Sequence, residues 1–361
     1  MTTRRVLVSG AGGFVGRHVV EALAERGLLV RATDREGTLL PDLPSGIERD
    51  LRDLSTAPLD DLLEGVTDIV HVAGLFDLGA SRDSLFAANV DLTRRIALAA
   101  VERDIRLVHI SSVTVYGRPR KIPVREDAPH RPASAYEESK REGERVIASL
   151  VRDRGLRATI LRPSGIYGPW GRYGLAVIAS AYALSLASGR VDTIPAFRGG
   201  TKMTHVHVED VASAVACVLE KDETIGKAYN VADDTEVAWG DLLEVIERTI
   251  GIPPRERVPM SKWRAKWTAH AWRLWPESKR EKLNRSLDRK WRALVEERGL
   301  VPMLSPRLDR HAYDYWLADH VYSNDALKRL GFRLRHPDSR QGLAETIAWY
   351  LDRRWLPAPT K

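Results

Sequence analysis

The sequence contains a single cysteine, Cys217, and no apolar run long enough to cross a membrane. One cysteine excludes an internal disulfide and fits a reducing compartment. Cys217 falls in the run ASAVACVLE, which has a helical pattern, so we expect an inert buried thiol and not a nucleophile. A spanning helix needs about 20 apolar residues, and the first apolar run is too short for a signal peptide. We therefore expect a cytoplasmic protein, with the inner face of the membrane as a further location.

The sequence also lacks long-period repeats and low-complexity tracts. Its 361 residues, 43% of them hydrophobic, can form one large lobe or two joined lobes with a sizeable core. The formal net charge of +7 permits attraction to a membrane surface, a nucleic acid or a phosphorylated substrate. Charge alone does not choose among these partners.

Short β-branched runs alternate with amphipathic helical patterns over the first two-thirds of the chain. This alternation is typical of parallel βαβ units with right-handed crossovers. We therefore predict an α/β fold with a doubly wound parallel (Rossmann) sheet and a smaller, mostly helical C-terminal substrate lobe. The expected strands are 4–9, 28–34, 67–74, 106–112 and 158–164, and the expected helices are 12–27, 84–103 and 134–154.

The regular alternation fades after IYGP, the run that ends at Pro169. We expect residues 1–165 to form the cofactor-binding domain, with returns to the sheet at about 201–235 in the runs THVHV and KAYNVAD. Residues 166–200 and 236–361 would form the substrate lobe. That lobe includes a basic, tryptophan-rich helical segment, 260–299.

A glycine-rich turn lies between the first strand and the first helix. Glycines there permit a tight turn and a close approach of the backbone to a pyrophosphate, which then lies at the N-terminus of the helix. Strand, glycines, helix and second strand follow in the order that a dinucleotide site requires. The residues that we predict to bind the cofactor here are Gly10, Gly12, Gly13, Phe14, Val15 and Gly16.

An acidic residue, Asp34, ends the second strand 18 residues after Gly16. Its carboxylate can accept hydrogen bonds from ribose hydroxyls and would repel a 2′-phosphate, which favours NAD. The adjacent Arg35 could pair with such a phosphate, so NADP stays the alternative. Asp50 and Leu51, expected to follow the third strand, could flank the adenine or form an ordinary loop. The small Ala73 and Gly74, at the end of the fourth strand, suit close passage of a ligand. We expect the neighbouring His71 to be structural.

The segment Tyr136-Glu-Glu-Ser-Lys140 places a phenol and an ammonium one helical turn apart. A free phenol has a pKa near 10, too high for a base at neutral pH, and a nearby positive charge lowers it. We expect Tyr136 to remove or return the proton of a hydroxyl as hydride moves. Ser112, in HISSVTVYG, would hydrogen-bond the same substrate oxygen.

A series of motifs supports this interpretation, in the order GAGGFVG, Asp34, DIVHVAG, NVDLT around Asn89, SSVTVYG, YEESK, LRPSGIYGP and HVEDVA. The sequence thereby resembles the extended short-chain dehydrogenase/reductases, also called the NAD-dependent epimerase/dehydratase family, over residues 4–235 and more loosely beyond. The resemblance implies that Ser112, Tyr136 and Lys140 form the catalytic triad and that Lys140 also bonds the nicotinamide ribose.

The same resemblance implies a supporting role for Asn89 and places Pro163 and Ile166 beside the nicotinamide. No metal ligands are expected. The sequence departs from the family pattern at Ser9, where threonine is usual, and at Gly74, where a second alanine is more common.

The segment 260–299 contains five of the ten tryptophans and is rich in lysine and arginine. Trp263, Trp267, Ala271 and Leu274 would share one helical face, and Leu283, Leu287, Trp291 and Leu294 a face of a second helix. A basic amphipathic helix with tryptophans is typical of a membrane interface. The alternative is a helical hairpin whose tryptophans pack on their own domain. Nucleic-acid binding is disfavoured, because these tryptophans fit a buried face better than stacking platforms.

These features favour a hydrophobic substrate, and the pattern most resembles the 3β-hydroxysteroid and sterol-4-carboxylate dehydrogenase branch. We expect an NAD(P)-dependent enzyme, acting as a homodimer, that interconverts a secondary alcohol and a ketone. One alternative is a nucleotide-sugar epimerase or dehydratase, in which residues such as Arg172 and Arg190 could bind a diphosphate. Another is a non-catalytic NAD-binding protein, although such proteins usually lose the tyrosine or the lysine that this chain keeps.

Overall fold

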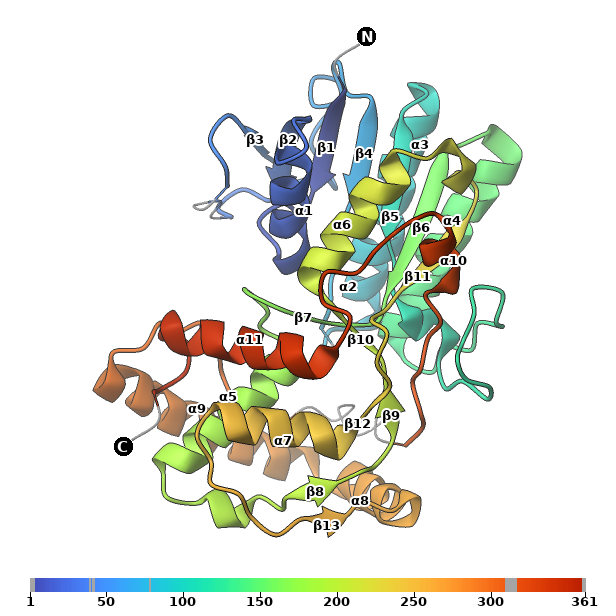
Figure 1. Ribbon diagram of the computed structural model, residues 1–361. Helices are drawn as coiled ribbons and strands as arrows, with labels where there is room; N and C mark the ends of the chain where they lie inside the picture. Colours follow the sequence, from blue (N-terminus) through green and yellow to red (C-terminus); the bar gives the residue numbers. More distant parts are fainter. Residues whose placement is uncertain (1–3, 39, 41–42, 78, 309–316, 359–361) are drawn as a thin grey trace.

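The computed structural model describes residues 4–38, 40, 43–77, 79–308 and 317–358. At its centre is a sheet of seven parallel strands in the order β11-β6-β5-β4-β1-β2-β3. The strands are β1 (Arg5–Ser9), β2 (Leu29–Asp34), β3 (Glu48–Leu51), β4 (Asp68–His71), β5 (Arg106–Ile110), β6 (Ala158–Pro163) and β11 (Ala228–Val231). Helices flank the sheet on both faces, which confirms the predicted doubly wound Rossmann fold (Figure 1).

The two faces of the sheet are covered by different pairs of helices. Helices α1 (Phe14–Ala24) and α6 (Val208–Leu219) pack together on one face, and α3 (Leu92–Glu102) and α4 (Ala135–Arg154) pack on the other. Successive side chains of a strand point to opposite faces. Val6 and Val8 of β1 accordingly join the core beneath α1 and α6, whereas Leu7 joins the core beneath α3 and α4.

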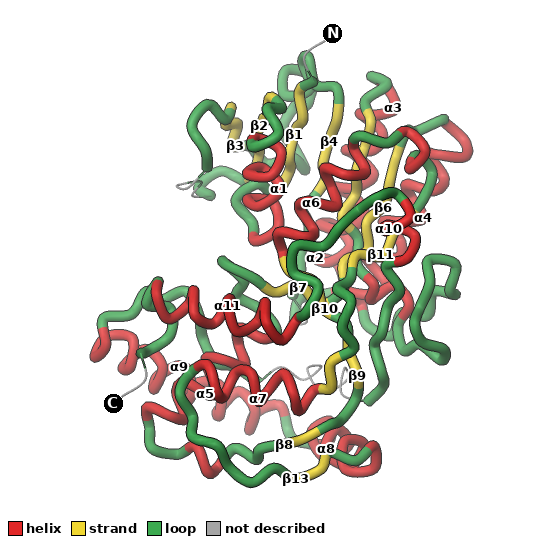
Figure 2. Tube along the Cα trace, in the orientation of Figure 1, coloured by secondary structure: helices red, strands yellow, loops and turns green. Residues whose placement is uncertain are grey.

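A smaller lobe lies beyond the carboxyl ends of the strands (Figures 1 and 2). Its core includes Tyr182, Leu242, Trp291 and Ile347, all buried. The helices of the lobe are α5 (Leu175–Ala187), α7 (Trp239–Thr249), α8 (Lys262–Leu274), α9 (Glu277–Arg298) and α11 (Ser339–Asp352). Three two-stranded sheets join β7 (Gly165–Tyr167) to β10 (His205–His207), β8 (Phe197–Arg198) to β13 (Val258–Pro259), and β9 (Lys202–Met203) to β12 (Val237–Ala238). A short helix, α10 (Asp325–Arg329), lies against β11.

One detail of the sequence prediction is wrong. Only β11 returns to the large sheet; β10 pairs instead with β7, and β11 occupies the position beside β6. The segment expected to be helical over 84–103 is helical, with a π-helical turn (Ala87–Asp91) between α2 (Arg82–Phe86) and α3. Within the described ranges, no helix has both the length and the apolar content to cross a membrane.

Candidate functional site

The turn between β1 and α1 can pack this closely only because it is built from glycines. Gly10 has a φ of +73°, and a β-carbon there would lie 2.8 Å from the Ala73 backbone nitrogen. A β-carbon on Gly16 would collide with the Gly10 carbonyl oxygen, so the helix could not begin so close to the strand. Gly13 precedes α1 without any side-chain cap, which leaves the amide end of the helix open to an anion. Phe14 and Val15, half-buried, form the first turn of this helix.

Asp34 at the end of β2 faces this turn. Its carboxylate accepts a hydrogen bond from the Gly12 backbone N–H at 2.9 Å and another from the Arg35 N–H at 2.8 Å. The Arg35 side chain is exposed. The acid therefore lies beside the glycine turn, where the ribose of a dinucleotide is expected.

Asp50 and Leu51 are the last two residues of β3 and do not follow it, contrary to the sequence prediction. The Asp50 carboxylate is engaged by Arg52 in two hydrogen bonds of 2.7 and 2.5 Å, and the same guanidinium holds Asp61. Both carboxylate oxygens of Asp50 thus already accept hydrogen bonds from Arg52. A contact of Asp50 or Leu51 with an adenine ring stays a prediction.

The three residues of the expected triad come together between β5 and α4. Ser112 lies directly after β5 and is half-exposed. Tyr136 lies in the first turn of α4, whose N-cap, Ser134, accepts a hydrogen bond from the Glu137 N–H at 3.3 Å. Ser112 hydrogen-bonds the Tyr136 side chain. Lys140, one turn further along α4, donates to the Ile110 carbonyl at 3.1 Å.

Burial sets the electrostatics of this group. It raises the pKa of the Tyr136 phenol, and the hydrogen bond from Ser112 offsets only part of that rise. Burial also lowers the pKa of Lys140 to about 8, while Glu144 raises it. In the protein without cofactor, burial outweighs the hydrogen bond from Ser112, so the pKa of the phenol lies above its ordinary value. A lowering of this pKa by Lys140 together with the bound cofactor stays a prediction. In this state Tyr136 holds its proton.

Asn89 links the loop after β4 to the catalytic helix. Its side-chain oxygen accepts from the Leu75 N–H at 2.8 Å, and its amide donates to the Ser139 hydroxyl at 3.0 Å. Ser139 in turn donates to the Tyr136 carbonyl at 2.7 Å. Asn89 lies in the π-helical turn, and such turns frequently mark functional sites. The sequence identified Asn89 but gave no sign of the extra residue in the helix.

Two buried histidines lie behind the triad. His71 is hydrogen-bonded to the Ser9 hydroxyl at 2.8 Å and to Thr93 at 3.2 Å, and its ring stacks on His109 with centroids 5.5 Å apart. Burial first, and then the charge of Lys140, lowers the pKa of His71 to about 3. His71 is therefore neutral and part of the framework, as expected.

Sequence reasoning missed a buried ion pair that holds the same helix. Arg162 of β6 donates to both oxygens of Glu144 in α4, at 2.9 and 2.8 Å, and also to the Tyr116 hydroxyl at 2.7 Å. Tyr116 then donates to Asn230 of β11 at 2.8 Å. No local sequence pattern could reveal a pair whose members are 18 residues apart on different elements.

Tyr136 lies at the end of a row of three aromatic rings. The Phe76 ring lies edge-on to Tyr136 with centroids 5.0 Å apart, and Tyr173 lies edge-on to Phe76 at 5.4 Å. Tyr136 is only 7% exposed, whereas Phe76 and Tyr173 are 40% and 46% exposed. Phe76 follows β4 and Tyr173 precedes α5, so the surface next to the phenol is aromatic and comes from both lobes.

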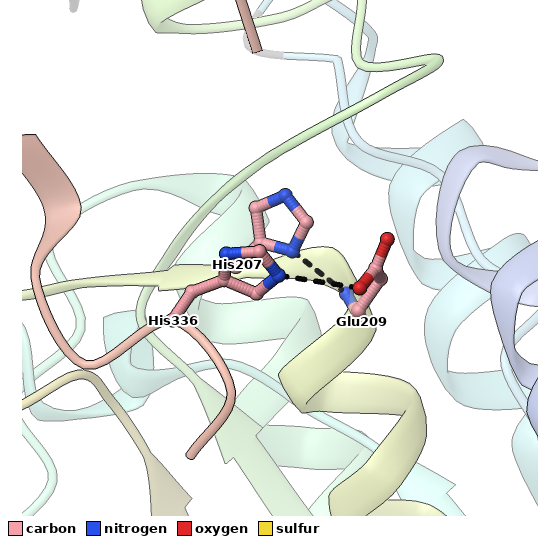
Figure 3. Close-up of side chains that lie close together, drawn as sticks. All are labelled: His207, Glu209 and His336. Atoms are coloured by element: carbon pink, nitrogen blue, oxygen red, sulfur yellow. Dashed lines mark hydrogen bonds and ion pairs between the residues drawn. The ribbon is translucent and has the colours of Figure 1, made fainter. Parts of the chain in front are cut away.

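A second polar cluster lies where the C-terminal segment crosses the start of α6 (Figure 3). His336 hydrogen-bonds the Glu209 carboxylate at 3.2 Å, and the Glu209 N–H donates to Nδ1 of His207 at 3.3 Å. The hydrogen bond raises the pKa of His336 and lowers that of Glu209 to about 2. The three ligand atoms lie within 4.8 Å of one another, close enough for one ion. Because Nδ1 of His207 accepts a hydrogen bond from the backbone, the proton of this imidazole lies on Nε2. The hydrogen bond and ion pair between His336 and Glu209 connect α6 to the segment before α11.

Comparison with known proteins identifies the family. The model of the NAD dependent epimerase/dehydratase family matches residues 6–232. This chain belongs to that family. Sterol demethylase protein B of Methylococcus capsulatus is 31% identical over 367 residues, which is 98% of this chain and 99% of that one.

Other relatives match shorter stretches. UDP-glucose 4-epimerase of Azospirillum brasilense is 29% identical over 236 residues, covering 60% of this chain and 68% of its own. The uncharacterised protein YbjS of Escherichia coli is 34% identical over 173 residues, about half of each chain. Among solved structures, gox2253 superposes with a TM-score of 0.69 at 26% identity and covers 96% of this chain and 98% of that one.

The cofactor of this family member is NAD, which accepts or donates hydride. The residues present fit it: no β-carbon fits at Gly10 or Gly16, so α1 begins close behind β1, and Asp34 lies beside this turn, where a ribose is expected. Pro163 ends β6 and Ile166 lies in β7, at the same carboxyl edge as Ala73 and Gly74. Their individual contacts with NAD remain predictions.

Proposed function

We propose that this enzyme is an NAD-dependent dehydrogenase/reductase that interconverts a secondary alcohol and a ketone on a hydrophobic, sterol-like substrate. The observation that carries the proposal is the contact of Phe76 with Tyr136 and of Tyr173 with Phe76. The Phe76 and Tyr173 rings are both substantially exposed, and exposed aromatic rings at this position favour an apolar ring system over a sugar diphosphate.

The roles of the side chains follow from their positions. Ser112, half-exposed and bonded to Tyr136, can orient the substrate oxygen. The raised pKa of Tyr136 keeps the phenol protonated, so the proton that a ketone oxygen needs during reduction is present on it. For oxidation the phenol must lose its proton, and a positive charge on the bound cofactor would favour that loss.

The relatives support this substrate class. The relative named as a sterol demethylase protein aligns along nearly the whole chain, including the substrate lobe. The relative named as a UDP-glucose 4-epimerase aligns over 60% of the chain. Substrate specificity in a two-lobed enzyme depends on the lobe, so the longer alignment carries more weight.

Nucleotide-sugar epimerisation is the second candidate, because several relatives carry that name. Arg172, exposed next to Tyr173, could contact a diphosphate. The two activities differ in outcome, since epimerisation leaves the oxidation state of the sugar unchanged.

A substitution series at position 76 tests the proposal. We expect Phe76→Asn to raise the KM for a 3-hydroxysteroid roughly tenfold, since an aromatic contact contributes about 1.4 kcal/mol. Phe76→Leu, the matched control, keeps an apolar surface and should change KM much less. The proposal would be wrong if both variants had the same KM for hydroxysteroids as the unmodified enzyme. It would also be wrong if the enzyme converted only UDP-sugars.

A further inference from the structure

Helix α8 carries its large apolar side chains on the outside of the protein. Trp263 is 66% exposed, Trp267 60% and Leu274 70%. These residues are spaced i, i+4 and i+11, so they lie on one side of the helix. The two indole rings are 6.1 Å apart and form a continuous patch with each other. We call these three residues the α8 tryptophan face.

Other large side chains of the segment do pack within the lobe, unlike this face. Trp291 of α9 is buried, and its indole N–H donates to the Leu304 carbonyl at 2.6 Å. Trp272, on the opposite side of α8, is half-buried, and its ring centroid lies 5.0 Å from that of Trp275. The hairpin interpretation therefore holds for α9 and is wrong for the outer face of α8.

The segment that contains the α8 tryptophan face is rich in lysine and arginine. The sequence of α8, KWRAKWTAHAWRL, contains four basic residues and no acidic one. Helix α9 adds four exposed cations that have no ion-pair partner in the part of the chain that the structure describes: Lys279, Lys282, Arg289 and Lys290. Helix α8 lies at the end of the lobe away from the large sheet (Figure 1).

We propose that the α8 tryptophan face inserts into the interface of an anionic lipid membrane. Indole rings partition to the boundary between headgroups and acyl chains, and lysine and arginine are attracted to anionic headgroups. Large exposed apolar patches on soluble proteins commonly mark such contacts, and the positive charge selects an anionic surface. The inference uses no residue of the catalytic site, and it would bring the enzyme to the phase in which a hydrophobic alcohol dissolves.

Flotation of the full-length protein with vesicles tests this directly. Phosphatidylcholine vesicles with phosphatidylserine should carry the protein, and pure phosphatidylcholine vesicles should carry far less. Binding should weaken as salt rises from about 0.1 M to about 0.5 M, because screening shortens the reach of the charges. Trp263→Ala/Trp267→Ala should reduce the bound fraction at least tenfold while its thermal unfolding midpoint is unchanged, since both side chains are exposed.

Two further variants separate the contribution of the tryptophans to membrane binding from that of the basic residues. Leu29→Ala/Val301→Ala removes exposed apolar side chains elsewhere, 45% and 41% exposed, and should bind like the unmodified protein. Lys282→Gln/Lys290→Gln should weaken binding and reduce its salt dependence.

Three results would overturn the proposal: no flotation of the unmodified protein, equal flotation of the double tryptophan variant, or equal binding to neutral vesicles. Sedimentation would show whether the tryptophan variant instead breaks a dimer, and a duplex oligonucleotide would show whether nucleic acid is bound in place of lipid. Flotation measures binding and not turnover, so a protein that fails to float would leave the proposed function intact. A protein that floats but converts only UDP-sugars would refute the proposed function and leave the membrane proposal intact.

Discussion

Gly74 and Asn89 are so close that a β-carbon on Gly74 would lie 2.7 Å from the Asn89 side-chain oxygen. The same β-carbon would lie 3.4 Å from the Lys140 ammonium nitrogen. A side chain at position 74 would therefore crowd the Asn89 side chain, which bonds Leu75 and Ser139.

Gly74→Ala should therefore disturb the Asn89 hydrogen bonds. We expect a loss of about 1–3 kcal/mol in the free energy of unfolding, the usual cost of overpacking, together with reduced turnover. Gly79→Ala in the same loop is the control, because its nearest neighbour, an Asp77 oxygen, would be 3.5 Å away in ordinary contact. Denaturant unfolding of both variants measures the difference, and equal stabilities would contradict the explanation.

Replacing Asp34 should change cofactor preference. Asp34→Ala removes the carboxylate that would repel a 2′-phosphate and leaves Arg35 to pair with it, so NADP should bind more tightly and NAD more weakly. Calorimetric titration of both cofactors provides the measurement. Glu36→Ala, an exposed acid two residues further on, should leave the preference unchanged. Tighter binding of NADP by the unmodified protein would refute the role of Asp34.

The buried ion pair of Arg162 with Glu144 should contribute far more to the free energy of unfolding than the exposed ion pairs of Glu142. Glu144→Gln breaks a buried pair whose side chains are 7% and 5% exposed, and we expect it to cost about 3–5 kcal/mol, because a buried charge loses its partner. Glu142→Gln, on the same helix, disrupts contacts with the more exposed Arg141 and Arg145 and should cost about 1 kcal/mol or less. Similar unfolding free energies for the two variants would contradict this.

Lys140 should lower stability at neutral pH. Burial lowers its pKa from the ordinary 10.5 to about 8 in the folded protein. Below about pH 8, Lys140 is charged in both the folded and the unfolded protein, and burying that charge destabilises the folded protein. Between about pH 8 and 10.5 the unfolded protein binds more protons than the folded one, so the free energy of unfolding rises with pH. Lys140→Met should therefore be more stable than the unmodified protein at pH 7, by roughly 1–3 kcal/mol, yet inactive. This advantage should shrink as pH rises from 7 to 10; a constant difference would exclude the linkage.

The sequence predicts the parallel sheet and the residues of the site because these are set by local patterns. Glycines at Gly10 to Gly16, an acid at the end of the next strand and the spacing of Tyr136 and Lys140 are all visible in short windows. The pairing of β10 with β7, by contrast, depends on contacts between segments far apart in the sequence. The aromatic contact of Phe76 with Tyr173 joins residues nearly a hundred positions apart.

The segment 260–299 shows the same limit most clearly. Its periodicity predicts two amphipathic helices, and both form. Periodicity alone could not tell that the apolar face of α9 would be buried and that of α8 exposed, because both faces have the same spacing. That difference arises only from packing against the lobe.

Net formation of NADH from a hydrophobic alcohol tests the central claim most directly. We predict that the enzyme, mixed with NAD and a 3-hydroxysteroid, releases many equivalents of NADH per subunit as the ketone accumulates. Tyr136→Phe should bind NAD as before and lose about 10²–10⁴-fold in this rate, the usual contribution of a positioned acid/base. Conversion of UDP-sugars without NADH release, and no NADH from any hydroxysteroid, would contradict the account, as would a Tyr136→Phe variant with full activity.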